Sequence, residues 1–138
     1  MMRYVESAIV LTFGILTVVF YIITSCKDPG ILKKEYKFLH LLEFVHPLDM
    51  CPYCQVLRTP RSRHCNICNK CCERFDHHCP WTNNCVGIKN HNSFMAFLTS
   101  LMLFMLSYYV TFGQAVYQII TGYPEFTDPD VTHCKYIN

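Results

Sequence analysis

The segment Asp76-His77-His78-Cys79-Pro80-Trp81 places a carboxylate, two imidazoles, a thiol and a large aromatic ring within six positions. A cysteine thiol with a pKa of roughly 8.5 is mostly protonated at neutral pH, and a neighbouring histidine base converts it to a nucleophile. An aspartate that accepts one ring N–H of the histidine turns the other ring nitrogen toward the thiol. Cys79, His77 and Asp76 are therefore candidates for nucleophile, general base and orienting group.

The same residues end a segment that is rich in metal ligands. Residues 51–85 hold eight cysteines and three histidines. A Cys-x-x-Cys step presents two thiolates to one tetrahedral zinc, and the segment has three such steps: Cys51/Cys54, Cys65/Cys68 and Cys68/Cys71. Two zinc ions with four ligands each would use eight of these eleven candidates. Spacing alone leaves open whether Cys79 and His77 are among the ligands, with Asp76 hydrogen-bonded behind them.

A disulfide scaffold is the main alternative, because small cysteine-dense domains are usually secreted and oxidised. The histidines beside Cys65 and Cys79 argue against it, since zinc accepts imidazole nitrogen and thiolate together and a disulfide uses no histidine. We therefore expect zinc in a reducing compartment. The segment has few large apolar residues, so the metal must supply folding free energy that hydrophobic burial cannot.

Two uncharged apolar stretches, 8–25 and 94–120, flank this segment in a chain of 138 residues. Each is about as long as a membrane-spanning helix requires. The first could instead be a signal sequence, which would carry the cysteines to an oxidising compartment and conflict with zinc. Ten of the twelve Lys and Arg residues lie between the stretches, against six acids, and this excess favours a cytosolic location for the segment. The net charge of +2 gives little support for nucleic-acid binding.

The predicted fold class is an α-helical membrane protein, in which two transmembrane helices flank a cytosolic, zinc-stabilised Cys-rich domain with short β-hairpins. The expected boundaries are a transmembrane helix at 8–25, a juxtamembrane linker at 26–49, the Cys-rich zinc domain at 50–93, a second transmembrane helix at 94–120 and a non-cytosolic tail at 121–138.

The order of these motifs is similar to that of a known family. It runs Cys51-x2-Cys54-x9-His64-Cys65-x2-Cys68-x2-Cys71, then Asp-His-His-Cys-Pro-Trp, then Asn83-Asn84-Cys85-Val86-Gly87 and Asn90-x3-Phe94. This pattern resembles the DHHC protein S-acyltransferases over about residues 50–97. Asp28-Pro29-Gly30, just after the first apolar stretch, resembles the family's motif at that place.

The resemblance implies the distribution of ligands. One zinc would be held by Cys51, Cys54, His64 and Cys71, and a second by Cys65, Cys68, His78 and Cys85. Cys79, His77 and Asp76 are then left for chemistry. Cys72 has no role that the resemblance assigns, and we expect it to be a reduced bystander.

The resemblance also implies a two-step acyl transfer, in which the Cys79 thiolate attacks a fatty acyl-CoA and the acyl group, palmitoyl above all, then passes to a protein cysteine. Trp81 is a candidate for contact with the acyl-CoA. The alternative role for its large ring is to pack as a wedge under the loop. The candidates for the CoA phosphates are Arg61, Arg63, Lys70, Arg74 and Lys89, with anionic lipid headgroups as the alternative partners. A nucleophilic Cys79 is expected to be exposed and low in pKa, whereas a zinc-bound one is protected.

The implied partners are fatty acyl-CoA, cytosolic or membrane proteins with acceptor cysteines, and the lipid bilayer, with no nucleic acid. The implied location is an endomembrane (Golgi or ER) or the plasma membrane, with the catalytic domain in the cytosol. Family members usually carry four membrane helices, and the two apolar stretches here resemble the second and third. The chain is therefore expected to be a fragment, or to self-associate to complete a bundle. The alternative function is a non-catalytic, membrane-anchored zinc scaffold that recruits proteins.

Overall fold

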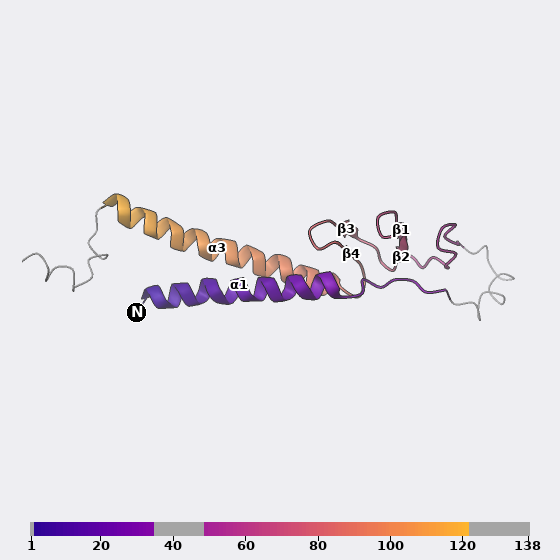
Figure 1. Cartoon of the computed structure of the whole chain (residues 1–138), viewed down its shortest axis with the longest axis horizontal. Coiled ribbons are helices and arrows are strands. Elements are labelled where there is room, and N and C mark those ends of the chain that lie inside the picture. Colours follow the sequence, from indigo (N-terminus) through magenta and orange to yellow (C-terminus); the bar gives the residue numbers. More distant parts are fainter. Residues whose placement is uncertain (1, 35–48, 122–138) are drawn as a thin grey trace, which may run out of the picture.

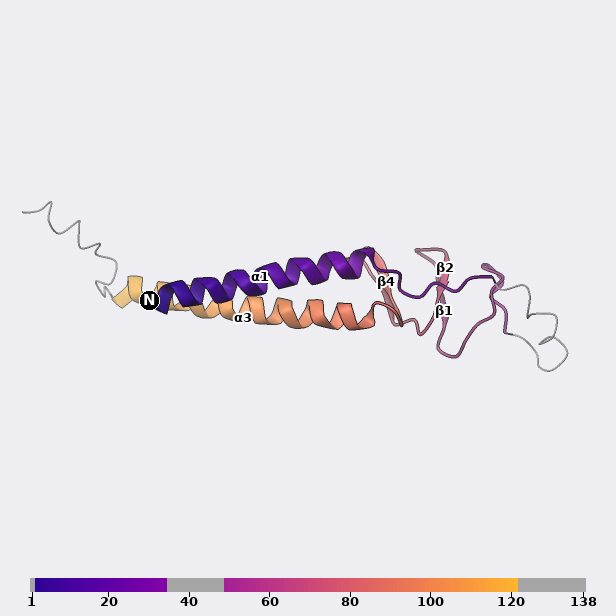
Figure 2. The ribbon, with the colours of Figure 1, turned by 90° about the horizontal axis from the view of Figure 1, so that it is seen from below.

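A computed structural model of the chain describes residues 2–34 and 49–121. Two long helices, α1 (Met2–Cys26) and α3 (His91–Thr121), lie side by side and antiparallel (Figures 1 and 2). The Cys-rich region projects beyond the end at which α1 stops and α3 starts. The helices contain the predicted stretches 8–25 and 94–120, whereas most of the predicted linker and nearly all of the predicted tail lie outside the described residues.

Both helices have the length and composition of membrane spans. An 18-residue window reaches a mean hydropathy of 2.3 within Tyr4–Cys26 and of 1.6 within His91–Thr121. Large apolar side chains are exposed along both helices. The two helices approach each other closely where a small residue of α1 faces a large residue of α3. A Cβ placed at Gly14 of α1 would lie 3.2 Å from the Phe104 ring of α3, so the small residue permits the helices to approach.

Regular structure in the Cys-rich region is limited to two short antiparallel hairpins, as predicted. Strand β1 (Arg63–Cys65) pairs with β2 (Lys70–Cys72), and β3 (His77–Cys79) pairs with β4 (Asn84–Val86). Each strand has three residues, so the hairpins are too short to be stable by pairing alone and need other links.

The chain that leaves α1 is one of these links, because it lies along strand β2. The backbone N–H of Leu32 donates to the Cys71 carbonyl at 2.9 Å, and the N–H of Glu73 donates to the Gly30 carbonyl at 2.8 Å. Asp28 ties the segment down. Its carboxylate accepts the N–H groups of Gly30 and Ile31 and lies 3.1 Å from the Lys89 ammonium. Burial alone would raise the pKa of Asp28, but these interactions outweigh it and lower the pKa.

Gly87 lies where this segment meets both hairpins. A Cβ at this position would be 2.3 Å from Cys72 Sγ and 2.5 Å from the Pro29 carbonyl oxygen, so no larger residue fits. Cys72 is 1% exposed, and its thiol donates to the same Pro29 carbonyl at 3.4 Å. Burial raises the pKa of Cys72 to about 11, which keeps the group a neutral thiol. Cys72 therefore fills the joint between the linker and the hairpins.

We predict that Gly87→Ala lowers the free energy of unfolding by about 1–3 kcal/mol, because the added methyl group overpacks a joint made of backbone atoms. Gly113→Ala is the matched control, since no atom lies within 4 Å of a Cβ at Gly113. Thermal unfolding of both variants in the same detergent, followed by circular dichroism, measures the difference. Equal midpoints for the two variants would contradict the close packing at Gly87.

Candidate metal centres and active site

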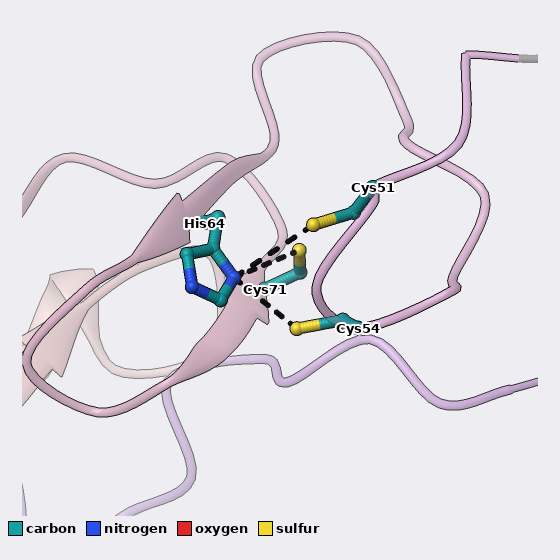
Figure 3. Close-up of side chains that lie close together, drawn as sticks. All are labelled: Cys51, Cys54, His64 and Cys71. Atoms are coloured by element: carbon teal, nitrogen blue, oxygen red, sulfur yellow. Dashed lines mark hydrogen bonds between the residues drawn. The ribbon is translucent and has the colours of Figure 1, made fainter.

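The first cluster of metal ligands forms around His64. Its Nδ1 lies 3.7 Å from Cys51 Sγ, 3.2 Å from Cys54 Sγ and 3.8 Å from Cys71 Sγ. Figure 3 shows the three sulfur atoms converging on this nitrogen, from the knuckle before β1 and from β2. Cys51 and Cys71 are buried, so the centre of the cluster is shielded from solvent.

The second cluster repeats this arrangement around His78 of β3. Its Nδ1 lies 3.8 Å from Cys65 Sγ, 3.4 Å from Cys68 Sγ and 3.7 Å from Cys85 Sγ. The sulfur atoms of Cys85 and Cys68 are 3.5 Å apart. In each cluster the four ligand atoms all lie within 4.8 Å of one another.

Both clusters fit tetrahedral zinc. With Zn–S at about 2.3 Å and Zn–N at about 2.05 Å, tetrahedral angles place sulfur and nitrogen about 3.6 Å apart and two sulfurs about 3.8 Å apart. The sulfur–nitrogen distances of 3.2–3.8 Å bracket the first of these values. Three thiolates and one imidazole form a common structural zinc set, so either cluster could hold a zinc ion. The two sets are the ones that the resemblance implied.

Strand geometry explains why neighbouring residues belong to different clusters. Side chains alternate between the two faces of a strand. His64 pairs with Cys71, and these two residues share a face and a cluster. The next residue, Cys65, points to the other face and enters the second cluster. The hairpin β1–β2 thus contributes to both clusters.

The charges in each cluster also favour a cation. The backbone N–H of Cys54 is the largest influence on Cys51 and helps to lower the pKa of Cys51 to about 6, which favours the thiolate. Burial, together with the neighbouring thiolates, raises the pKa of Cys71 to about 12. In the second cluster, burial and neighbouring thiolates likewise raise the pKa of Cys85, while hydrogen bonds outweigh burial and lower that of Cys65. A divalent cation would offset this repulsion between thiolates.

His77 and Cys79 lie on the face of β3 opposite to His78. As residues i and i+2 of a strand, their Cα atoms are about 7 Å apart and their side chains point the same way. Asp76 Oδ2 lies 3.5 Å from His77 Nδ1, and the His77 ring meets Phe94 of α3 edge-on, with 5.2 Å between ring centroids. The candidate base is therefore positioned by a carboxylate on one side and an aromatic ring on the other.

Cys79 departs from one expectation. The side chain belongs to neither cluster, as a nucleophile requires, yet the residue is only 5% exposed, whereas an exposed thiol was expected. Its strand is held by pairing with β4, which itself contacts the end of α1, and the Thr82 hydroxyl donates to the Cys79 carbonyl at 3.4 Å. Cys79 is thus buried in a strand that pairs with β4, and β4 in turn packs against α1.

The residues predicted to contact acyl-CoA are not all brought together. Arg61 and Arg74 line a polar pocket of about 340 Å³ together with Asp76 and with His91 at the start of α3. Arg63 lies on β1 and is not part of the pocket lining. Trp81 is 84% exposed on the loop between β3 and β4, also outside the pocket. Of the other candidates for the CoA phosphates, Arg74 lines the pocket, whereas Lys70 and Lys89 are not part of its lining.

Two asparagines, Asn84 and Asn90, belong to the pattern that carries the family resemblance, but the sequence argument gave neither of them a role. The buried Asn90 side chain accepts the N–H of Gly87 at 2.9 Å and donates to the Cys85 carbonyl at 2.8 Å, directly before α3 begins. The Asn84 side chain donates to carbonyls at the end of α1. An asparagine directly before an apolar helical stretch is a recognisable signal of a helix start, so a local structural role for Asn90 could have been predicted. The partners of Asn84 are distant in sequence and leave no such signal.

Comparisons with known proteins identify the family of the chain. A profile of the DHHC palmitoyltransferase family matches residues 45–137. The chain is similar to palmitoyltransferase Hip14 of Drosophila melanogaster, with 40% identity over 101 residues that cover 67% of this chain and 16% of that protein. It is also similar to palmitoyltransferase ZDHHC17 of Homo sapiens, with 43% identity over 90 residues that cover 60% and 14% of the two chains.

Palmitoyltransferase ZDHHC9 of Bos taurus is 50% identical over 70 residues, which cover 51% of this chain and 19% of that protein. The Cys-rich region, with two Cys/His clusters that could hold zinc, lies between two helices that are long and apolar enough to cross a membrane. The chain belongs to the DHHC palmitoyltransferase family. It spans between about an eighth and a quarter of the length of the first relatives it matches, at 16%, 24% and 12%.

We predict that Cys71→Ser lowers the zinc content of the purified chain from two ions to one or fewer, because it removes a thiolate from the first cluster. Cys72→Ser is the adjacent control and should retain both ions, since Cys72 contacts backbone carbonyls instead of a cluster. Mass spectrometric metal analysis under reducing conditions measures both. The assignment of the clusters would be wrong if the two variants lost zinc equally.

Proposed function

We propose that this chain carries the catalytic core of a protein S-acyltransferase, which moves a fatty acyl group, palmitoyl above all, from acyl-CoA to protein cysteines through an acyl-Cys79 intermediate. One observation carries the proposal. His77 and Cys79 share the face of β3 that points away from the second cluster, and Asp76 lies 3.5 Å from His77. A thiol, a base and an orienting carboxylate are therefore available beside the two Cys/His clusters.

In the first step, His77 takes the proton of Cys79, and the thiolate attacks the carbonyl carbon of the acyl-CoA thioester. The carbon–sulfur bond to CoA breaks. The CoA sulfur takes the proton from His77 and leaves as a thiol. In the second step, His77 takes the proton of an acceptor cysteine, whose thiolate attacks acyl-Cys79 and releases the Cys79 thiol. One thioester replaces another, so catalysis depends on positioning and thiolate formation. The zinc ions would hold the hairpins and take no part in these steps.

The proposed setting is the membrane surface, with α1 and α3 spanning the bilayer and the Cys-rich region in the cytosol. The excess of Lys and Arg between the helices supports this orientation. An apolar groove of about 770 Å³ runs along the two helices and is lined by residues that include Leu11, Gly14, Leu101 and Phe104. Such a surface suits an acyl chain, because each buried methylene contributes about 0.8 kcal/mol.

The proposed site for the CoA phosphates is the pocket that contains Arg61 and Arg74, since guanidinium groups bind phosphate through paired hydrogen bonds. Arg63 and Trp81 remain candidates for contacts with the CoA outside this pocket. The proposed protein partners are membrane or cytosolic proteins with acceptor cysteines, and self-association is a further proposal. The proposed location is an endomembrane, Golgi or ER, or the plasma membrane.

The second candidate function is a membrane-anchored zinc scaffold that recruits proteins without catalysis. The burial of Cys79 favours this candidate, because a nucleophile must be reached by its substrate. The two candidates differ in whether Cys79 forms a thioester.

We predict that the purified chain in membranes becomes labelled by a clickable palmitoyl-CoA in a form that neutral hydroxylamine removes. Cys79→Ser should abolish this label, and His77→Ala should slow labelling by about 10²–10⁴-fold, as expected for loss of a general base. Cys72→Ser, which alters a buried thiol outside the clusters, should label normally. A label that persists in Cys79→Ser would exclude this residue as the nucleophile, and no label in any variant with both zinc ions bound would support the scaffold.

We predict that Arg61→Glu raises the apparent KM for palmitoyl-CoA more than Arg63→Glu does, because Arg61 lines the polar pocket and Arg63 does not. Both exposed side chains undergo the same change of charge, so a general loss of attraction to the membrane should affect the two variants equally. Labelling rates at several concentrations of palmitoyl-CoA give KM, and sedimentation with anionic vesicles measures membrane binding. Equal KM values would place the CoA phosphates elsewhere.

A further inference from the structure

The end of α1 is capped by a side chain from a distant part of the chain. The last four carbonyls of a helix have no partner within the helix, and α1 ends at Cys26 with no basic residue in its last turn. Asn84 Nδ2 donates to the carbonyl oxygens of Thr24 at 3.1 Å, Ser25 at 3.2 Å and Lys27 at 2.9 Å. The two N–H groups of one amide therefore lie within hydrogen-bond distance of three carbonyls that are about sixty residues away along the chain.

Asn84 is also the residue opposite Cys79. It begins β4, and its partner in the antiparallel register is Cys79. The Asn84 Oδ1 accepts the N–H of Cys85 at 2.9 Å, which fixes the orientation of the amide so that its N–H groups face α1. A second contact comes from α1 itself, since the Tyr21 hydroxyl donates to the Trp81 carbonyl at 3.3 Å. Two links thus hold the end of α1 to both sides of the β3–β4 loop.

We propose that Asn84 is a positioning residue, which together with Tyr21 docks the β3–β4 hairpin onto the end of α1 and so fixes the depth of Cys79 at the membrane surface. This inference rests on the proposed function and deepens it. An acyl-CoA with its chain in the bilayer and its head in water presents the thioester at a set depth, so the thiol must be held at that depth. Misplacement of a reacting group by about 1 Å can cost about 100-fold in rate.

The chain offers a direct probe of this depth, because Trp81 is its one tryptophan and lies in the docked loop. The wild-type chain in phosphatidylcholine nanodiscs, with lipids brominated at successive acyl positions, should show Trp81 fluorescence quenched within a narrow range of depths. Asn84→Asp keeps the side-chain size but replaces the donor amide with a carboxylate, which the carbonyls and the negative helix end repel. Its quenching profile should broaden or shift.

The matched control is Asn83→Asp, which makes the same change of charge at the exposed neighbouring residue. Asn83 has a φ of 47°, a conformation that Asp tolerates as Asn does. This variant should keep the wild-type quenching profile, and both variants should retain two zinc ions. An unchanged profile in zinc-loaded Asn84→Asp, or an equal change in Asn83→Asp, would overturn the proposal.

Tyr21→Phe decides the matter if Asn84→Asp loses its zinc, because it removes a single hydroxyl from α1 and leaves the clusters intact. Its profile should shift in the same direction by a smaller amount, and no shift would then overturn the proposal. In palmitoyl-CoA labelling, Asn84→Asp should lower kcat by at least about tenfold with little change in KM, since the helices still bind the acyl chain. If the wild type is not labelled, the proposed function fails, while the quenching profiles still decide whether Asn84 docks the hairpin.

Discussion

The alternation of side chains along short strands is the constraint on which the rest of this structure depends. The buried apolar residues of the Cys-rich region are six cysteines and two valines, which is too little apolar surface to fold a domain of this length. Metal coordination at the two clusters would replace the missing core, and coordination requires thiol and imidazole groups at defined places. Because β1 directs His64 to one face and Cys65 to the other, one hairpin serves both clusters, and neither cluster is independent of its neighbour.

The same alternation creates the candidate active site. Once His78 faces the second cluster, His77 and Cys79 must face away from it. The cluster residue in the middle of the motif, His78, therefore determines the direction of the two residues beside it. Phe94 meets the His77 ring from α3, so the orientation of the candidate base also depends on the helix that follows. The second Cys/His cluster, strand geometry and helix packing thus meet at three consecutive residues of β3.

Much of this architecture could be predicted from local pattern, and the remainder could not. Charge-free apolar runs predicted both helices, and Cys-x-x-Cys steps predicted the metal clusters and their hairpins. The division of ligands between clusters came from the family resemblance, because His64 and Cys65 are adjacent in sequence and belong to different sets. Cys72 was expected to be a bystander. Its contact with Pro29 joins residues 43 positions apart, and a local sequence pattern does not reveal such a contact. The burial of Cys79 likewise depends on tertiary contacts that no spacing rule contains.

The hairpin β3–β4 unites all of these functions. It contributes His78 and Cys85 to a cluster, carries Cys79, caps α1 through Asn84 and accepts the Asn90 side chain that precedes α3. Because this hairpin is held from several sides, Cys79 has little freedom to move toward a substrate. In the proposed transferase the substrate must therefore come to a fixed thiol. Access along the apolar helices would then select a long acyl chain over small soluble electrophiles, and the reactivity of the thiol would matter less. The burial that favours a scaffold would then be part of the selectivity of an enzyme.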